Sequence, residues 1–165
     1  MEFGPGRPRT KSTDTAIGGP YSFALNNAVE AAFELGVLIV VAAGNEGSLA
    51  RDVSPASAAN ALTVGAIDAL WQQCSFSNYG PEVNIQAPGL DIESAYIATD
   101  NATAILSGTS MAAPHVAGLA MYVAALEKTN TAEELRNKIL DMGIKGKAKS
   151  LTSDTPNLIA HNGAR

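Results

Sequence analysis

The chain has 165 residues, of which 46% are hydrophobic and 16% charged, a balance that suits one α/β domain with a buried core. Its net charge of −5 and sequence pI near 4.9 argue against nucleic acid as a partner. The single cysteine, Cys74, excludes an internal disulfide, and no stretch is expected to be long and apolar enough to cross a membrane.

The first fifteen residues are predicted to be a flexible lead, of natural or recombinant origin, and the ordered domain is predicted to comprise residues 16–165. Residues 1–12 are polar, contain Gly, Pro and Arg, and lack the apolar core of a signal peptide. Residues 11–15 (KSTDT) are too polar for a strand in the buried centre of a sheet.

A helix, a strand and a polar turn follow one another next. Ser22 is predicted to cap a helix that ends at Gly36. Residues 37–41 (VLIVV) are continuously apolar and β-branched, as in a strand buried on both faces of a parallel sheet. Asn45 follows this strand, at the carboxyl edge where ligands bind to such sheets.

The second half of the chain alternates short strands with two helices. Residues 62–66 are predicted to form another buried strand, and residues 92–97 and 103–106 an antiparallel pair. Residues 108–118 (GTSMAAPHVAG) begin with small residues and lead into an apolar helical pattern, so Ser110 lies at the start of a buried helix. A second amphipathic helix begins after Thr131, with Glu134 in a capping box.

The eleven residues 108–118 resemble the nucleophile segment of the subtilisin-like serine proteases (peptidase S8), and most closely the proteinase K-like branch. The resemblance extends over most of the chain and matches the C-terminal portion of the family's domain. It implies a partial subtilisin-like fold of the α/β class. In this implied fold, the sheet is mostly parallel and flanked by helices, and its N-terminal strands are missing.

The resemblance implies a site and a role for each of its residues. Ser110 would be the nucleophile and Asn45 the side-chain donor of the oxyanion hole. Residues Ile17, Gly18 and Gly19 would pair with the extended substrate. Residues Ala42, Ala43 and Gly44 would line the pocket for the residue that precedes the cut.

The histidine base that this chemistry needs is missing from the expected position. The family's triad runs Asp, His, Ser along the chain, whereas both histidines here follow Ser110. His115 lies five residues after Ser110, roughly 140° around a helix, and so faces elsewhere. The chain is therefore predicted to be a fragment that carries the nucleophile and the oxyanion donor but is inactive alone. Its partners would be protein or peptide substrates, and the missing N-terminal part or a propeptide.

No cofactor is expected to be required, although members of this branch often bind calcium through two carbonyls and a carboxylate. The corresponding positions are Ala59, Ala61 and Asn84, and the loss of the carboxylate predicts a weakened site. By resemblance the protein would be extracellular or vacuolar, and no membrane partner is expected.

Two other hypotheses remain open. The chain could be a non-catalytic binding partner or antigen derived from a protease. Alternatively, it could be an α/β-hydrolase in which Asp141 or Asp154 and His161 complete a triad with Ser110. That second alternative is weakened because Ala112 replaces the last glycine of the usual Gly-x-Ser-x-Gly elbow.

Overall fold

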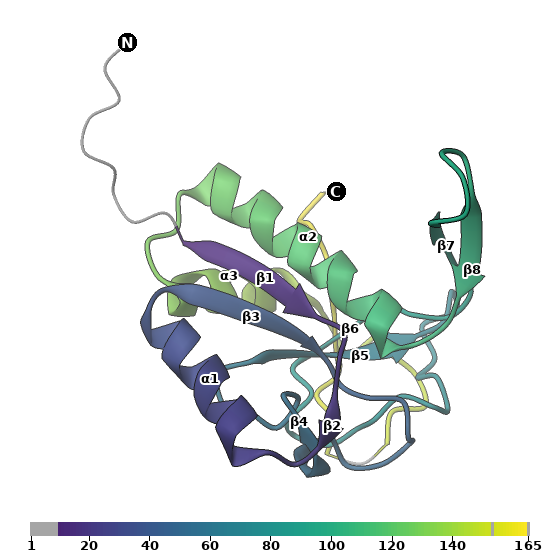
Figure 1. Ribbon diagram of the computed structural model, residues 1–165, viewed down its shortest axis with the longest axis horizontal. Coiled ribbons are helices and arrows are strands. Elements are labelled where there is room, and N and C mark those ends of the chain that lie inside the picture. The colour runs from purple at the N-terminus through teal and green to yellow at the C-terminus, as the bar shows by residue number, and fades with distance from the viewer. Residues whose placement is uncertain (1–9, 153, 165) are drawn as a thin grey trace.

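A six-stranded, mainly parallel sheet forms the centre of the computed structural model, which describes residues 10–152 and 154–164 (Figure 1). The strand order is β1-β3-β5-β6-β10-β9, in which every neighbouring pair is parallel except β10 with β9. The strands are β1 (Lys11–Thr15), β3 (Val37–Ala42), β5 (Leu62–Ile67), β6 (Ile85–Pro88), β9 (Ile144–Lys145) and β10 (Leu158–Ile159). The predicted α/β class with a mostly parallel sheet flanked by helices is confirmed.

Helices cover both faces of this sheet. The first, α1 (Phe23–Glu34), packs on one face through Val29, and α2 (Thr109–Glu127) and α3 (Ala132–Met142) pack on the other. As predicted, the Ser22 hydroxyl caps α1 by accepting the N–H of Leu25, and Gly36 follows the helix with a φ of +82° that favours glycine. These caps fix where the chain leaves α1 and enters β3.

Of the two hydrogen bonds in the predicted capping box of α3, the one to the Thr131 side chain is confirmed, and the one to the Glu134 side chain has a different donor. The Thr131 hydroxyl accepts the N–H of Glu134 at 3.0 Å. The Glu134 carboxylate, however, accepts the N–H of Asn130 at 2.9 Å, one residue before the N-cap. The carboxylate still satisfies a backbone donor beside the start of the helix.

The boundary predicted at residue 15 is wrong, because residues 11–15 are a strand and not part of a flexible lead. Strand β1 pairs in parallel with β3, with Lys11 opposite Val37 and Thr15 opposite Val41. Its polar composition is tolerated because β1 is an edge strand, and Lys11 and Asp14 are exposed. Residues 1–9 of the predicted lead lie outside the described residues.

Helix α2 also corrects the expectation that no stretch could cross a membrane. Within residues 10–152 and 154–164 it is the one helix long and apolar enough to do so by length and composition. A core helix passes the same test, and one side of α2 is buried against β3, β5 and β6 through residues such as Ala113, Val116 and Ala120. The high proportion of small apolar residues reflects this close packing on the sheet.

Short elements complete the fold outside the main sheet. Strand β2 (Gly19–Pro20) pairs with β4 (Val53–Ser54), which follows the one-turn helix η1 (Ala50–Asp52). As predicted, β7 (Ile92–Ala95) and β8 (Thr103–Leu106) form an antiparallel hairpin, which projects from the body beside the start of α2 (Figure 1).

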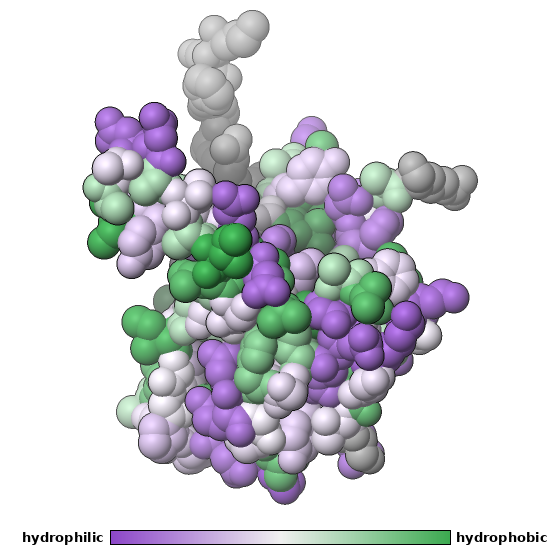
Figure 2. Space-filling view, turned by 90° about the vertical axis from the view of Figure 1, so that its right-hand side faces the viewer, coloured by the Kyte–Doolittle hydropathy of each residue, from purple (hydrophilic) through white to green (hydrophobic). Residues whose placement is uncertain are grey.

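Large apolar side chains are exposed on α2 and on the projecting hairpin. On α2, Met121 and Leu126 are 61% and 62% exposed, and on the hairpin Ile97 is 95% exposed. Figure 2 shows hydrophobic side chains interspersed with hydrophilic ones on the side of the molecule that carries the hairpin. Exposed apolar side chains of this size often mark surfaces that contact another molecule or another part of a protein.

Candidate functional site

Ser110 lies in the first turn of α2, where the backbone N–H groups have no acceptor within the helix. The positive end of the helix dipole is also at this position, so negative charge beside Ser110 is favoured. Pro114 lies inside the helix and has no N–H to donate to the carbonyl of Ser110. The start of α2 is thus suited to stabilise a negatively charged oxygen beside Ser110.

Asn45 is held beside this helix start by the buried residue Thr109. The Asn45 side-chain oxygen accepts the N–H of Thr109 at 2.8 Å and its hydroxyl at 2.9 Å. The Thr109 hydroxyl in turn accepts the N–H of Gly44 at 3.1 Å. Because both bonds to Asn45 use its carbonyl oxygen, the amide N–H groups remain available to an acceptor outside this network.

A second buried side chain, Asn78, holds the loop that follows Asn45. Its amide oxygen accepts the N–H groups of Glu46 and Ser48, and its amide nitrogen donates to the Glu46 carboxylate at 2.7 Å and to the carbonyl of Ala43. Gly44 has a φ of +104°, and a side chain there would collide with the Asn78 amide. Glycine is therefore required where strand β3 turns into the site.

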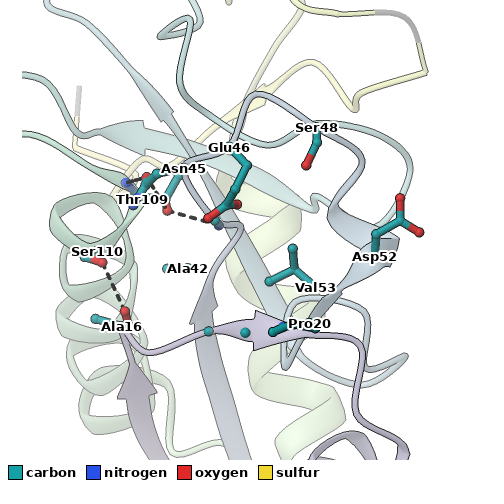
Figure 3. A pocket seen from close by; sticks show the side chains of 13 residues that line it. Ala16, Pro20, Ala42, Asn45, Glu46, Ser48, Asp52, Val53, Thr109 and Ser110 are labelled. Carbon is teal, nitrogen blue, oxygen red and sulfur yellow. Dashed lines mark hydrogen bonds between the residues drawn. The ribbon is translucent and has the colours of Figure 1, made fainter.

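A pocket of about 470 Å³ opens between this loop, strand β2 and the start of α2 (Figure 3). It is lined by residues from three parts of the chain: Ala16, Gly18, Gly19, Pro20, Ala42, Gly44, Asn45, Glu46, Ser48, Asp52, Val53, Thr109 and Ser110. The structure thus brings together six of the eight residues predicted for the site.

The other two predicted residues lie outside the pocket lining. Ile17 is 82% exposed, and Ala43 is fully buried in the core beneath the site. Their neighbours Gly18 and Gly44 contact the pocket instead, because successive residues of an extended chain point in opposite directions.

The hydroxyl of Ser110 has no histidine partner. It donates to the carbonyl of Ala16 at 3.0 Å (Figure 3). The His115 ring bonds the carbonyl of Met111 through Nδ1, and Nδ1 of His161 accepts the N–H of Gly163. The structure therefore does not assemble the alternative triad of Ser110 with His161.

The three calcium candidates do not provide a set of charged ligands. The Asn84 side-chain oxygen already accepts the N–H of Thr63 at 2.8 Å, and Ala59 and Ala61 could offer only backbone carbonyls. Among the residues that the structure describes, no three His, Cys, Asp or Glu residues cluster as metal ligands.

Cys74 is a packed residue and not a second nucleophile. Burial raises the pKa of its thiol to about 11, and the nearby charges of Asp68 and Asp91 act in the same direction. The thiolate, which is the reactive form of cysteine, is therefore scarce at neutral pH.

Five polar residues of the site were not predicted from the sequence: Thr109, Asn78, Glu46, Ser48 and Asp52. Two of them, Thr109 and Glu46, adjoin Ser110 and Asn45 in the sequence, so proximity to the motifs was an available signal. Asn78 contacts Glu46 across 32 residues of sequence, and nothing in the local pattern indicates that contact.

The fold and the site define an α/β protein in which a serine at the start of a core helix lies beside a fixed asparagine amide and an open pocket. The subtilase family profile (Peptidase S8) matches residues 3–156. The chain belongs to this family, as the sequence resemblance predicted.

Individual relatives agree with this assignment. The chain is 50% identical over 159 residues to alkaline protease 1 of Aspergillus clavatus, and 45% identical over 157 residues to a cuticle-degrading serine protease of Arthrobotrys oligospora. These matches cover 96% and 94% of this chain but only 39% and 38% of the relatives. The crystal structure of a cold-adapted subtilisin-like serine proteinase superposes with a TM-score of 0.86 at 34% identity, covering 94% of this chain and 56% of that protein. The predicted subtilisin-like fold is confirmed.

Proposed function

We propose that the chain carries the nucleophile half of a serine endopeptidase active site. Ser110 Oγ would attack the carbonyl carbon of a peptide bond and pass its proton to a base. The C–N bond would then break, the amine would leave with a proton, and water would release the acyl group from Ser110. Two observations support this proposal: the chain belongs to the subtilase family, and Ser110 lines the pocket at the start of α2.

The arrangement of Asn45 is the observation that carries this proposal most directly. Two bonds from Thr109 fix the Asn45 carbonyl oxygen, which directs the free amide N–H groups away from Thr109. Together with the N–H of Ser110, this amide would donate to the carbonyl oxygen as it gains negative charge. Ile17, Gly18 and Gly19 would pair with the backbone of the peptide.

The base and its carboxylate would come from chain outside these 165 residues. The Ser110 hydroxyl donates to a backbone carbonyl, and both histidines make other contacts. Two surfaces could receive additional chain: the edge of β1, which pairs only with β3 among the described strands, and the apolar exposed face of α2. In support, the chain spans 39% of the length of alkaline protease 1 of Aspergillus clavatus.

The chain alone is therefore expected not to hydrolyse peptides, because among the described residues the Ser110 hydroxyl bonds the carbonyl of Ala16 and neither histidine is its partner. A fluorophosphonate probe should label Ser110 slowly and incompletely, with no matching cleavage of peptide substrates. Rapid stoichiometric labelling together with peptide cleavage would contradict this expectation. The same missing base favours the second candidate function, a non-catalytic binding partner or antigen, for the chain by itself.

Substrates and location follow from the family as further proposals. We infer protein or peptide substrates, and an extracellular or vacuolar location, because the relatives named above are fungal proteases.

Calcium is expected to bind weakly or not at all at Ala59, Ala61 and Asn84. The amide of Asn84 carries no charge, and its oxygen is engaged by the N–H of Thr63. Calorimetric titration should show no tight binding to the unaltered chain, and Asn84→Asp should raise the affinity by restoring a carboxylate. Tight binding that Asn84→Leu abolishes would contradict this prediction.

A further inference from the structure

We propose that Asn101 is an acceptor site for N-linked glycosylation, and that the attached glycan covers the exposed apolar side chains of the β7–β8 hairpin. The inference rests on the extracellular or vacuolar location proposed above, because such glycans are attached to chains that enter the secretory route. It is independent of the role proposed for Ser110.

The sequence of the hairpin contains the triplet that this modification requires. An acceptor asparagine is followed two residues later by serine or threonine, with any residue except proline between them. Residues 101–103 are Asn-Ala-Thr. The chain has eleven asparagines, and Asn101 is the one that meets the requirement. A single position in the sequence is therefore the candidate.

The structure places Asn101 where a large enzyme can reach it. The residue is exposed and lies in the connection between β7 and β8, which forms the tip of the projecting hairpin (Figure 1). Two backbone hydrogen bonds close this tip: Ala102 donates to the carbonyl of Thr99 at 3.0 Å, and Tyr96 donates to the carbonyl of Ala102 at 2.8 Å. Neither bond uses the Asn101 side chain, so its amide can be modified while both bonds remain.

The second recognition residue, Thr103, is also exposed, at the first position of β8. Its hydroxyl donates to Oε1 of Glu93 on the neighbouring strand at 2.9 Å. Both side chains are exposed, so water can replace this hydrogen bond at little cost. The asparagine and the threonine of the triplet are thus accessible without the movement of any core side chain.

The modification is a substitution at the anomeric carbon of a sugar. The Nδ2 atom of Asn101 would attack this carbon in an oligosaccharide carried on a polyisoprenyl pyrophosphate. A bond forms between Nδ2 and the carbon, the bond between the carbon and the pyrophosphate oxygen breaks, and the lipid pyrophosphate leaves. Nδ2 gives up one proton to a base of the membrane-bound transferase, so the linked amide keeps one N–H.

The composition of the hairpin gives the glycan a physical role. Tyr96, Ile97, Ile105 and Leu106 are 50%, 95%, 64% and 49% exposed. Tyr96 and Ile97 belong to the same connection between β7 and β8 as Asn101. Exposed apolar side chains that lie together favour association between molecules, whereas a glycan is bulky and strongly hydrated. A glycan on Asn101 would therefore keep the hairpin soluble.

Translation of the 165-residue chain with endoplasmic-reticulum microsomes tests the modification without requiring activity. The chain would follow a signal peptide and a short tag with its own acceptor triplet, which reports entry into the microsomes. We expect two glycans on each chain, one on the tag and one on Asn101, detected as mass increases that endoglycosidase H removes. Asn101→Gln and Thr103→Val should each lose one glycan, whereas Thr103→Ser should keep both, because serine also satisfies the triplet.

The variants are chosen to preserve the fold. Asn101→Gln keeps an exposed amide, and Thr103→Val keeps a β-branched residue at the start of β8. Asn27→Gln, on the exposed surface of α1, is the matched control and should keep both glycans, because Asn27 lies outside any acceptor triplet.

A glycan on the tag with none on Asn101 would overturn the proposal. Two glycans on Asn101→Gln, or the loss of one from Asn27→Gln, would place the modification elsewhere and would also overturn it. These results are separate from the proposed peptidase function, which is tested by hydrolysis and not by the mass of the chain.

Light scattering tests the covering role of the glycan. The purified glycosylated chain should scatter less light than Asn101→Gln at the same concentration, because its apolar hairpin is covered. Ile97→Ser in the Asn101→Gln chain should lower the scattering again by removing the most exposed of these apolar side chains. Equal scattering from the glycosylated chain and Asn101→Gln would show that the glycan does not cover the hairpin.

Discussion

Peptide hydrolysis is expected to appear when the N-terminal part of a fungal relative, such as alkaline protease 1 of Aspergillus clavatus, is joined upstream of Thr10. The added chain would supply a histidine base and its carboxylate, and would cover the edge of β1 and the exposed face of α2. Ser110→Ala should then remove the activity, with a loss of about 10⁶ in kcat, which is typical when the nucleophile of such a protease is deleted. Hydrolysis of a chromogenic peptide by the purified chimera provides the measurement.

Two controls make this result specific. His115→Ala should retain activity, because the His115 ring bonds the carbonyl of Met111 and not Ser110. Circular dichroism and thermal unfolding should show that the Ser110→Ala chimera is as folded as its parent. A folded, soluble chimera with the complete triad and no hydrolysis would show that the half-site of Ser110 and Asn45 is not competent.

Replacement of Asn45 by alanine in the same active chimera is expected to lower kcat by about 10²–10³, the loss found when a subtilisin loses its oxyanion-hole asparagine. KM should change little, because the amide would bond the carbonyl oxygen mainly after negative charge has developed on it. Thr109→Val should produce a smaller loss of kcat in the same direction, since Thr109 orients the Asn45 amide by two hydrogen bonds. In Thr109→Val the bond from the backbone N–H remains, so the orientation is weakened and not abolished.

Stability must be measured alongside these rates, because Asn45→Ala also leaves the Thr109 N–H and hydroxyl without their acceptor. Unfolding in urea would separate a loss of structure from a loss of catalysis. Asn27→Ala, on the exposed surface of α1, is a matched control that should leave both kcat and KM unchanged. An unchanged kcat in folded Asn45→Ala would exclude Asn45 as an oxyanion donor.

Much of the local structure follows from short stretches of sequence. The apolar β-branched run at residues 37–41 predicts β3, and Ser22, Gly36 and Thr131 predict the ends of the helices. The small residues before the helical pattern place Ser110 in the first turn of α2. These features depend on propensities and hydrogen bonds between residues close together in the chain, so the sequence contains them directly.

Tertiary structure decided the role of residues whose local pattern is ambiguous or misleading. Residues 11–15 are polar, yet they form β1 because β3 provides a partner and the edge position leaves Lys11, Thr13 and Asp14 exposed. Helix α2 has the length and composition of a membrane helix, yet one of its faces packs on the sheet. Local composition determines neither outcome, because each depends on which other element lies alongside.

The sequence by itself determined the family, the fold class and the positions of Ser110 and Asn45, because motif residues of fixed spacing carry that information. Only the tertiary structure showed that Thr109 orients Asn45, that Asn78 anchors Glu46, and that Asp52 lies in the same pocket as Ser110. The contacts of Thr109 and Asn78 span 64 and 32 residues of sequence. These contacts join the loop after β3 to the start of α2 and to the connection between β5 and β6, so they form only in the folded chain and short-range patterns do not reveal them.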